Sequence, residues 1–272
     1  MSYLSAMNEL SSRSLIRVCG ADAGDFLQGL ITQDIANLKD NEARFAALLT
    51  PQGKILVDFF LLAHDGGFLV DCASAVAEAL VRKLTLYKLR AKVLIEADAT
   101  LGVFAGEKEG ALASFADPRL PALPVRAIAP RQGGPDGEAA YEGVRLDLGV
   151  PEFTKDFSGE EVFLLDVNYD ALRAVSYTKG CFVGQEVTSR MKRKGEVRKR
   201  TLIAMFDGPA PARGEKITAA GGAIGEIMSG AEGRSLALVR LDRLAAAKAD
   251  GAATEAGGQA LQLVFPPYLE TH

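Results

Sequence analysis

Short apolar runs separated by turn residues constrain the fold of this chain most strongly. In the N-terminal half the runs are residues 43–49, 55–62 and 68–71, and the turns between them are Pro51-Gln52-Gly53 and Asp65-Gly66-Gly67. Three runs of this length, joined by turns of these types, predict an antiparallel meander. A helical pattern at 75–87 and a strand at 92–96 extend it into an α+β unit.

A second set of such runs begins at residue 201 and alternates with glycine turns. These runs are residues 201–206, 216–219, 223–228, 236–241 and 260–265. Their spacing predicts a small β-barrel or sandwich at the C-terminus. Residues 15–20 predict a further strand, followed by a helix that Asp22 caps. The proline- and glycine-rich residues 106–139 predict an irregular connector, and 245–258 a loose loop.

Bulk composition is that of a globular protein. The chain has 272 residues, of which 48% are hydrophobic and 24% charged, and this is enough for one large core or a few smaller ones. No apolar run approaches the roughly 18 residues that span a bilayer, and the first residues lack the pattern of a secretory signal. Three widely spaced cysteines suit a reducing compartment. These features predict a cytoplasmic protein without membrane contact.

Scarce histidine and sparse cysteine exclude several kinds of site. The two histidines are His64, in a turn-like stretch, and His272. The sequence therefore disfavours a Ser-His-Asp triad and contains no H-E-x-x-H zinc site. No cysteine pair has C-x-x-C spacing, so we predict no resident metal site, and any iron–sulfur cluster would need ligands from elsewhere.

Cys181 stands in the most unusual stretch of the chain, Lys179-Gly-Cys-Phe-Val-Gly-Gln-Glu186. The flanking glycines permit tight turns and close approach of a ligand, and Gln185–Arg193 reads as a helix. Cys181 would then precede a helix N-terminus with Lys179 two residues away, and both features favour the thiolate. The alternative is a buried structural cysteine. Cys19 and Cys72, in apolar strands, fit that inert role better.

Positive charge is concentrated directly after this stretch. The chain has a net charge of −4, yet residues 179–200 contain eight basic and two acidic residues. This distribution indicates a local site for an anionic small molecule, an RNA or an acidic protein. Solvated surface charge is the simpler reading. No aromatic residue interleaves with the basic run at 192–200, so we expect no direct binding of nucleic acid.

Several sequence blocks resemble the YgfZ family, which is related to the glycine-cleavage T-protein, an aminomethyltransferase. The residues 179–186 resemble the family signature K-G-C-[aromatic]-x-G-Q-E. The supporting blocks are Arg145–Pro151, Leu164–Tyr169, Asp25–Gly29 with Thr32–Asp34, and Pro51–Lys54. The resemblance covers roughly residues 10–205 and weakens in the proline-rich stretch and the last 70 residues.

The resemblance implies an α+β fold in a three-domain arrangement like that of the T-protein. The implied domains are a discontinuous folate-binding domain (1–42 and 113–199), a second α+β domain (43–112) and a C-terminal β-barrel (200–272). A central opening would bind tetrahydrofolate or a derivative.

The function implied by the resemblance is that of a folate-binding accessory protein. It would serve the maturation or repair of iron–sulfur proteins, including tRNA-modifying enzymes, and would use the thiol of Cys181. Its partners would be a folate and the iron–sulfur assembly or client proteins, and we expect a monomer. Stand-alone turnover is not expected. The alternatives are an aminomethyltransferase-like, folate-dependent one-carbon enzyme and a folate scaffold in which the cysteine is structural.

Site residues follow from the matching blocks. Asp166 occupies the place whose T-protein counterpart holds the pteridine ring, and a carboxylate can accept two parallel N–H bonds from such a ring. Leu164 replaces the family's usual proline in that loop. The T-protein usually has two successive aspartates where this chain has Val57-Asp58. Asp166 could instead be an ordinary turn carboxylate, and Asp58 a strand charge. The full predicted set is Cys181 as the functional thiol, with Asp58, Arg145, Asp166, Asn168, Lys179, Gly180 and Gln185 as cofactor-binding residues.

Overall fold

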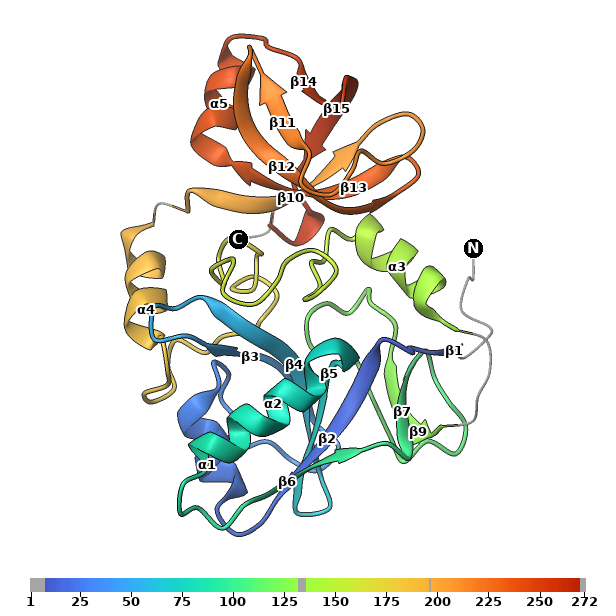
Figure 1. The fold of residues 1–272 in the computed structure, drawn as a ribbon, viewed down its shortest axis with the longest axis vertical. Coiled ribbons are helices and arrows are strands. Elements are labelled where there is room, and N and C mark those ends of the chain that lie inside the picture. Colours follow the sequence, from blue (N-terminus) through green and yellow to red (C-terminus); the bar gives the residue numbers. More distant parts are fainter. Residues whose placement is uncertain (1–7, 132–135, 196, 270–272) are drawn as a thin grey trace. The chain divides into compact units, whose positions relative to one another are not determined.

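The structure is a computed structural model that describes residues 8–131, 136–195 and 197–269. The chain folds into two compact units (Figure 1). Unit 1 comprises residues up to 142 together with 172–185, and unit 2 comprises 143–171 with the residues from 186 onward. Unit 1 contains two antiparallel β-sheets together with helices, and unit 2 contains a closed β-barrel. The predicted fold class, α+β with a C-terminal barrel, is confirmed.

Unit 1 is built on a five-stranded antiparallel sheet in the order β3-β4-β5-β2-β6. Its strands are β2 (Arg13–Cys19), β3 (Ala43–Leu49), β4 (Ile55–His64), β5 (Gly67–Ala73) and β6 (Leu94–Asp98). Helices α1 (Ala23–Leu30) and α2 (Ser74–Tyr87) contact this sheet (Figure 1). The meander predicted from the turn residues is present as β3-β4-β5.

The domain boundary predicted after residue 42 differs from the strand order of this sheet. Strand β2 lies between β5 and β6, so one sheet takes strands from both sides of that residue. The reason is physical: β2 is buried along most of its length and needs a backbone partner on each side to satisfy its N–H and C=O groups.

A second, four-stranded sheet of unit 1 has the order β1-β7-β9-β8. Its strands are β1 (Asn8–Glu9), β7 (Leu101–Ala105), β8 (Ala113–Phe115) and β9 (Arg126–Pro130). Two of these strands, and the start of helix α3 (Glu138–Asp147), fall within the stretch predicted to be an irregular connector. That prediction was wrong for these segments, while residues 132–135 of the same stretch lie outside the described residues.

A cluster of charged side chains is buried in unit 1. Arg126 at the start of β9 donates to Asp71 of β5 at 2.8 Å and to Asp117 at 3.2 Å. Its guanidinium also lies 3.9 Å from the centroid of the Phe60 ring. Arg119 binds Asp117 at 2.7 Å, and all the charged members of the cluster are at most 4% exposed.

Pairing keeps Asp117 in this cluster ionised. Although burial alone would raise it, the pKa of Asp117 is held below its ordinary value by the guanidinium groups of Arg119 and Arg126. The Tyr141 hydroxyl accepts from the same two arginines, at 2.6 and 2.8 Å. The cluster thus joins β5, β9, the loop before β9 and α3.

Unit 2 is dominated by a closed antiparallel barrel in the order β10-β13-β12-β11-β14-β15 (Figure 1). Its strands are β10 (Lys199–Met205), β11 (Lys216–Ala219), β12 (Gly222–Ala231), β13 (Arg234–Arg240), β14 (Thr254–Ala256) and β15 (Gln259–Val264). Helix α5 (Leu241–Ala249) and β14 occupy the stretch predicted to be a loose loop. That prediction was wrong, because Leu244, Ala247 and Ala256 are buried in the barrel core.

Helix α4 (Gln185–Lys194) follows the cysteine stretch, and a short 3-10 helix (Pro267–Leu269) follows β15. In the part of the chain that the structure describes, no helix is both long and apolar enough to span a bilayer.

Candidate functional site

Of the three cysteines, Cys181 alone is exposed. Its free thiol lies in the loop before α4, whereas Cys72 is fully buried in β5 and Cys19 is half-buried at the end of β2. Burial raises the pKa of the Cys72 thiol to about 12, so this group stays protonated and unreactive near neutral pH. The structure therefore places an inert thiol at Cys72 and an accessible one at Cys181.

Lys179 anchors the cysteine loop to the end of α1 and to the segment that follows it. Its ammonium group donates to the carbonyl oxygens of Gln28, Ile31 and Gln33 at 2.7, 2.7 and 2.9 Å. The side chain is 7% exposed, and burial lowers its pKa to about 8, against the carboxylate of Asp34, which raises it.

This geometry corrects the role predicted for Lys179. An ammonium group has three N–H donors, and all three are used by backbone carbonyls. Lys179 therefore has no donor left for the thiolate of Cys181 or for a cofactor. Its effect is to hold one end of the cysteine loop in place, which keeps the exposed thiol in a defined position.

Gly184 fixes the other end of the loop, at one of the tight turns expected from the flanking glycines. Its φ is +80°, and a Cβ built there would lie 2.7 Å from the carbonyl oxygen of Thr50. Only glycine tolerates both the left-handed backbone and this contact. Gly180, predicted to allow close approach of a ligand, has open space around it and no positive φ.

We expect Gly184→Ala to lower the free energy of unfolding by about 1–3 kcal/mol, through backbone strain and the contact with Thr50. Gly180→Ala is the matched control, since its new methyl group meets nothing within 4 Å, and it should change stability by less than about 0.5 kcal/mol. Urea denaturation of both variants measures the difference. Equal midpoints would contradict the role given to Gly184.

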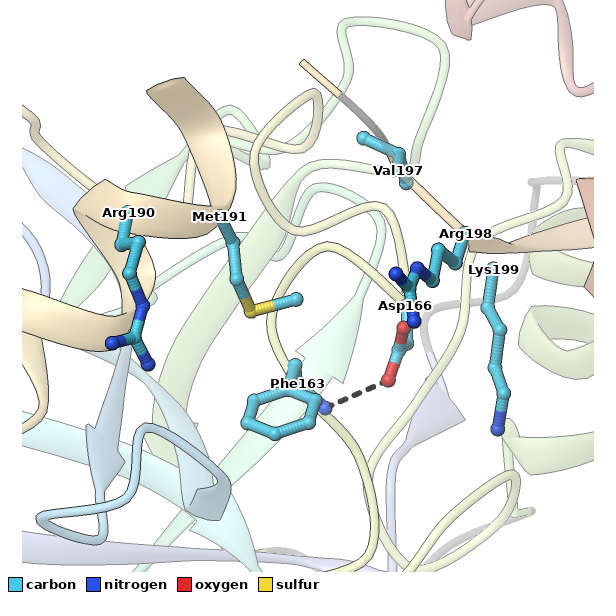
Figure 2. Close-up of a pocket in the computed structure, with 7 residues that line it drawn as sticks. All are labelled: Phe163, Asp166, Arg190, Met191, Val197, Arg198 and Lys199. Carbon is cyan, nitrogen blue, oxygen red and sulfur yellow. Dashed lines mark hydrogen bonds between the residues drawn. The ribbon is translucent and has the colours of Figure 1, made fainter. Parts of the chain in front are cut away.

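Asp166 lies in unit 2, in a loop whose apolar side chains are buried. Leu164, Leu165 and Val167 are each at most 1% exposed, so the leucine that replaces the family's proline is itself an anchor. Asp166 accepts a hydrogen bond from the backbone N–H of Phe163 at 3.1 Å and thereby closes a turn (Figure 2). The carboxylate remains half-buried.

A pocket of about 350 Å³ opens beside Asp166. Figure 2 shows its lining: Phe163 and Asp166 from the loop, Arg190 and Met191 from α4, and Val197, Arg198 and Lys199 from the segment that enters β10. The three cations are exposed and form no ion pair with any of the described residues. The pocket thus combines one carboxylate, apolar side chains and three cations with no carboxylate partner.

Two predicted ligand residues are buried in unit 2 instead. Arg145 is 0% exposed and donates to Asp156 at 2.7 Å and to Ser229 at 2.6 Å. Asn168 is also 0% exposed, and its amide donates to the Thr201 carbonyl at 2.8 Å and to the Tyr268 hydroxyl at 3.1 Å. Asn168 thereby holds the Asp166 loop against β10. Neither side chain lines the pocket beside Asp166.

Two other predicted residues belong to unit 1. Asp58 is 2% exposed on β4, and its partner position across the strand pair is Ala47. Gln185 is the first residue of α4, and its side-chain amide reaches the Gly180 carbonyl only at 3.4 Å. The cofactor roles of Asp58 and Gln185 stay predictions. Of the basic run at 192–200, residue 196 and the side chain of Lys194 lie outside the described part.

Known proteins match most of the chain. Mitochondrial iron–sulfur cluster assembly factor IBA57 from Mus musculus is 31% identical over 86% of this chain and 77% of its own length. The human protein shows the same identity and coverage. This chain belongs to the IBA57 family. A homologue from Pyricularia oryzae is 32% identical, with 86% of this chain and 71% of the relative covered.

The barrel and the fold have matches of their own. A model of the CAF17 C-terminal β-barrel domain matches residues 198–271. Aminomethyltransferase T of the glycine cleavage system from Bartonella henselae has a crystal structure that superposes with a TM-score of 0.73. It covers 97% of this chain and 86% of that protein at 18% identity. The T-protein-like fold predicted from the sequence blocks is confirmed.

Membership of the IBA57 family corrects one prediction and confirms another in part. The cytoplasmic localisation is contradicted, because the IBA57 relatives are named as mitochondrial proteins. The resemblance to YgfZ is confirmed at the level of the T-protein-like fold, while the matched relatives carry the IBA57 name.

Proposed function

We propose that this protein supports the maturation of iron–sulfur proteins, with Cys181 as the working thiol and a reduced folate bound beside Asp166. The observation that carries the proposal is the exposed thiol on a loop that Lys179 and Gly184 fix at both ends. The names of the relatives, iron–sulfur cluster assembly factors, support the same function. The clients include tRNA-modifying enzymes.

Cys181 is suited to a cluster that is shared with a partner. Iron–sulfur clusters are held by several thiolate ligands. Among the described residues no group of three or more histidine, cysteine or acidic side chains could hold a metal ion. An exposed, rigidly placed cysteine supplies one ligand, and an assembly or client protein supplies the rest. We further propose that the protein acts as a monomer and without direct contact to nucleic acid.

The pocket beside Asp166 has the chemistry that tetrahydrofolate or a derivative requires. The aminopyrimidine edge of its ring offers paired N–H donors, and a carboxylate can accept several hydrogen bonds besides the one from Phe163. Phe163 and Met191 offer apolar surface for the flat ring, and Arg190, Arg198 and Lys199 offer cations for the carboxylates of the glutamate end. The pocket volume of about 350 Å³ lies in the range of small-molecule sites.

We expect Asp166→Ala to weaken tetrahydrofolate binding by about 30- to 150-fold, or about 2–3 kcal/mol, because a charged acceptor is lost. Calorimetric titration measures this. Asp166→Asn keeps an acceptor for the Phe163 N–H and should still lose most of the affinity. Glu232→Ala, in an exposed turn of the same unit, is the control. An unchanged dissociation constant in both Asp166 variants would remove this residue from the site.

The alternative, a folate-dependent aminomethyltransferase-like transferase, stays a prediction. The T-protein likeness at 18% identity concerns the fold alone. Two features of the sequence weigh against turnover: the near absence of histidine and the single acid, Asp58, where the T-protein usually has two.

A further inference from the structure

A second hollow on the barrel has no role in the function proposed above. It has a volume of about 180 Å³ and lies where β10, β11, β12, β13 and the start of α5 come together. Four basic side chains line it, with one acidic residue, Glu226; the basic residues are Lys199, Lys216, Arg240 and Arg243. Positive charge is therefore concentrated here on a chain whose net charge is −4.

The positive charge of this hollow is only partly neutralised. Lys199 and Arg240 stand directly opposite each other on β10 and β13, and like charges in that position repel. Arg240 is paired with Asp242 at 2.7 Å and Lys216 with Glu226 at 2.6 Å. Within the described residues Lys199 and Arg243 have no carboxylate partner. An anion bound in the hollow would relieve this repulsion.

Lys199 connects this hollow to the pocket beside Asp166, because it lines both. A ligand that occupies the pocket with its ring and extends past Lys199 would enter a second, basic hollow. Such a ligand must be long and flexible. It must also carry further negative charges beyond the carboxylates that the cations of the pocket bind.

We propose that the barrel hollow binds the oligo-γ-glutamyl tail that extended folates carry, so that the protein prefers polyglutamylated folates. The proposal rests on the folate site at Asp166. Each added glutamyl unit brings one carboxylate, and the unpaired cations meet those carboxylates in sequence along the tail. No aromatic side chain lines the hollow, which disfavours single-stranded RNA, since its bases would have no surface on which to stack.

Calorimetry with tetrahydrofolate monoglutamate and pentaglutamate tests the tail site. We expect the pentaglutamate to bind about tenfold tighter at low salt, the sum of a few exposed charge pairs, and this advantage to shrink as salt is added. In Lys216→Gln/Arg243→Gln the advantage should fall below about threefold, while the monoglutamate constant stays unchanged. Lys248→Gln, on α5 but lining neither hollow, should keep the full advantage.

Equal affinities of the two folates in the unaltered protein would overturn the tail site and leave the Asp166 pocket standing. Failure of both folates to bind would overturn the pocket and the tail site together, so the two failures are distinguishable. A single-stranded RNA oligonucleotide that binds tighter than the pentaglutamate, and loses affinity in Lys216→Gln/Arg243→Gln, would assign the hollow to nucleic acid instead.

Discussion

Arg126→Met is expected to lower the free energy of unfolding by about 3–5 kcal/mol, because it removes a buried cation that pairs with two buried carboxylates. Arg126 bridges Asp71 and Asp117, and all three side chains are at most 4% exposed. Methionine roughly fills the space of the arginine stem but donates no hydrogen bond. The loss should appear in urea denaturation as a lower midpoint.

Arg17→Met serves as the control for this substitution. Arg17 is paired with Asp98 at 2.8 Å, but its side chain is 45% exposed, and such surface pairs contribute about 0–1 kcal/mol. If Arg126→Met costs no more than Arg17→Met, the buried cluster does not hold the two sheets of unit 1 together.

Local sequence patterns predicted the elements whose turn and apolar residues agree with their final structure. The strands of the meander and most strands of the barrel were predicted for this reason. The elements that were missed depend on contacts distant in sequence. Strand β9 of the proline-rich stretch pairs with β7, which precedes that stretch, as well as with β8 inside it. Helix α5 packs its buried Leu244 and Ala247 into the core of the barrel strands. Composition alone does not reveal such contacts.

The burial of the cysteines was predicted better than the burial of the charged residues. The apolar strand around Cys72 indicated burial, as observed, and Cys181, for which a buried position was the alternative, is exposed. Lys179 and Arg145 are buried against hydrogen-bond partners more than 80 residues away in sequence, such as Ile31 and Ser229. A motif shows which residues are present but not which of them the fold will bury. From the sequence, the cations that line the pocket beside Asp166 could be recognised only as members of a basic run.

Cys181→Ser is expected to abolish support of iron–sulfur enzymes in cells. Serine keeps nearly the shape of cysteine, but its hydroxyl stays protonated near neutral pH and does not replace a thiolate as a cluster ligand. Because Cys181 is exposed and the loop is fixed by Lys179 and Gly184, the substitution should leave the fold and tetrahydrofolate binding intact. Loss of function with retained folding would separate the thiol from any packing role.

Complementation of a strain that lacks the protein tests this central claim most directly. The strain receives the unaltered gene, Cys181→Ser or Cys19→Ser, and the activity of its iron–sulfur enzymes is measured together with the level of each variant. We predict full activity with the unaltered protein and with Cys19→Ser, and background activity with Cys181→Ser at an equal protein level. Full activity with Cys181→Ser would contradict the account and reduce Cys181 to a structural residue.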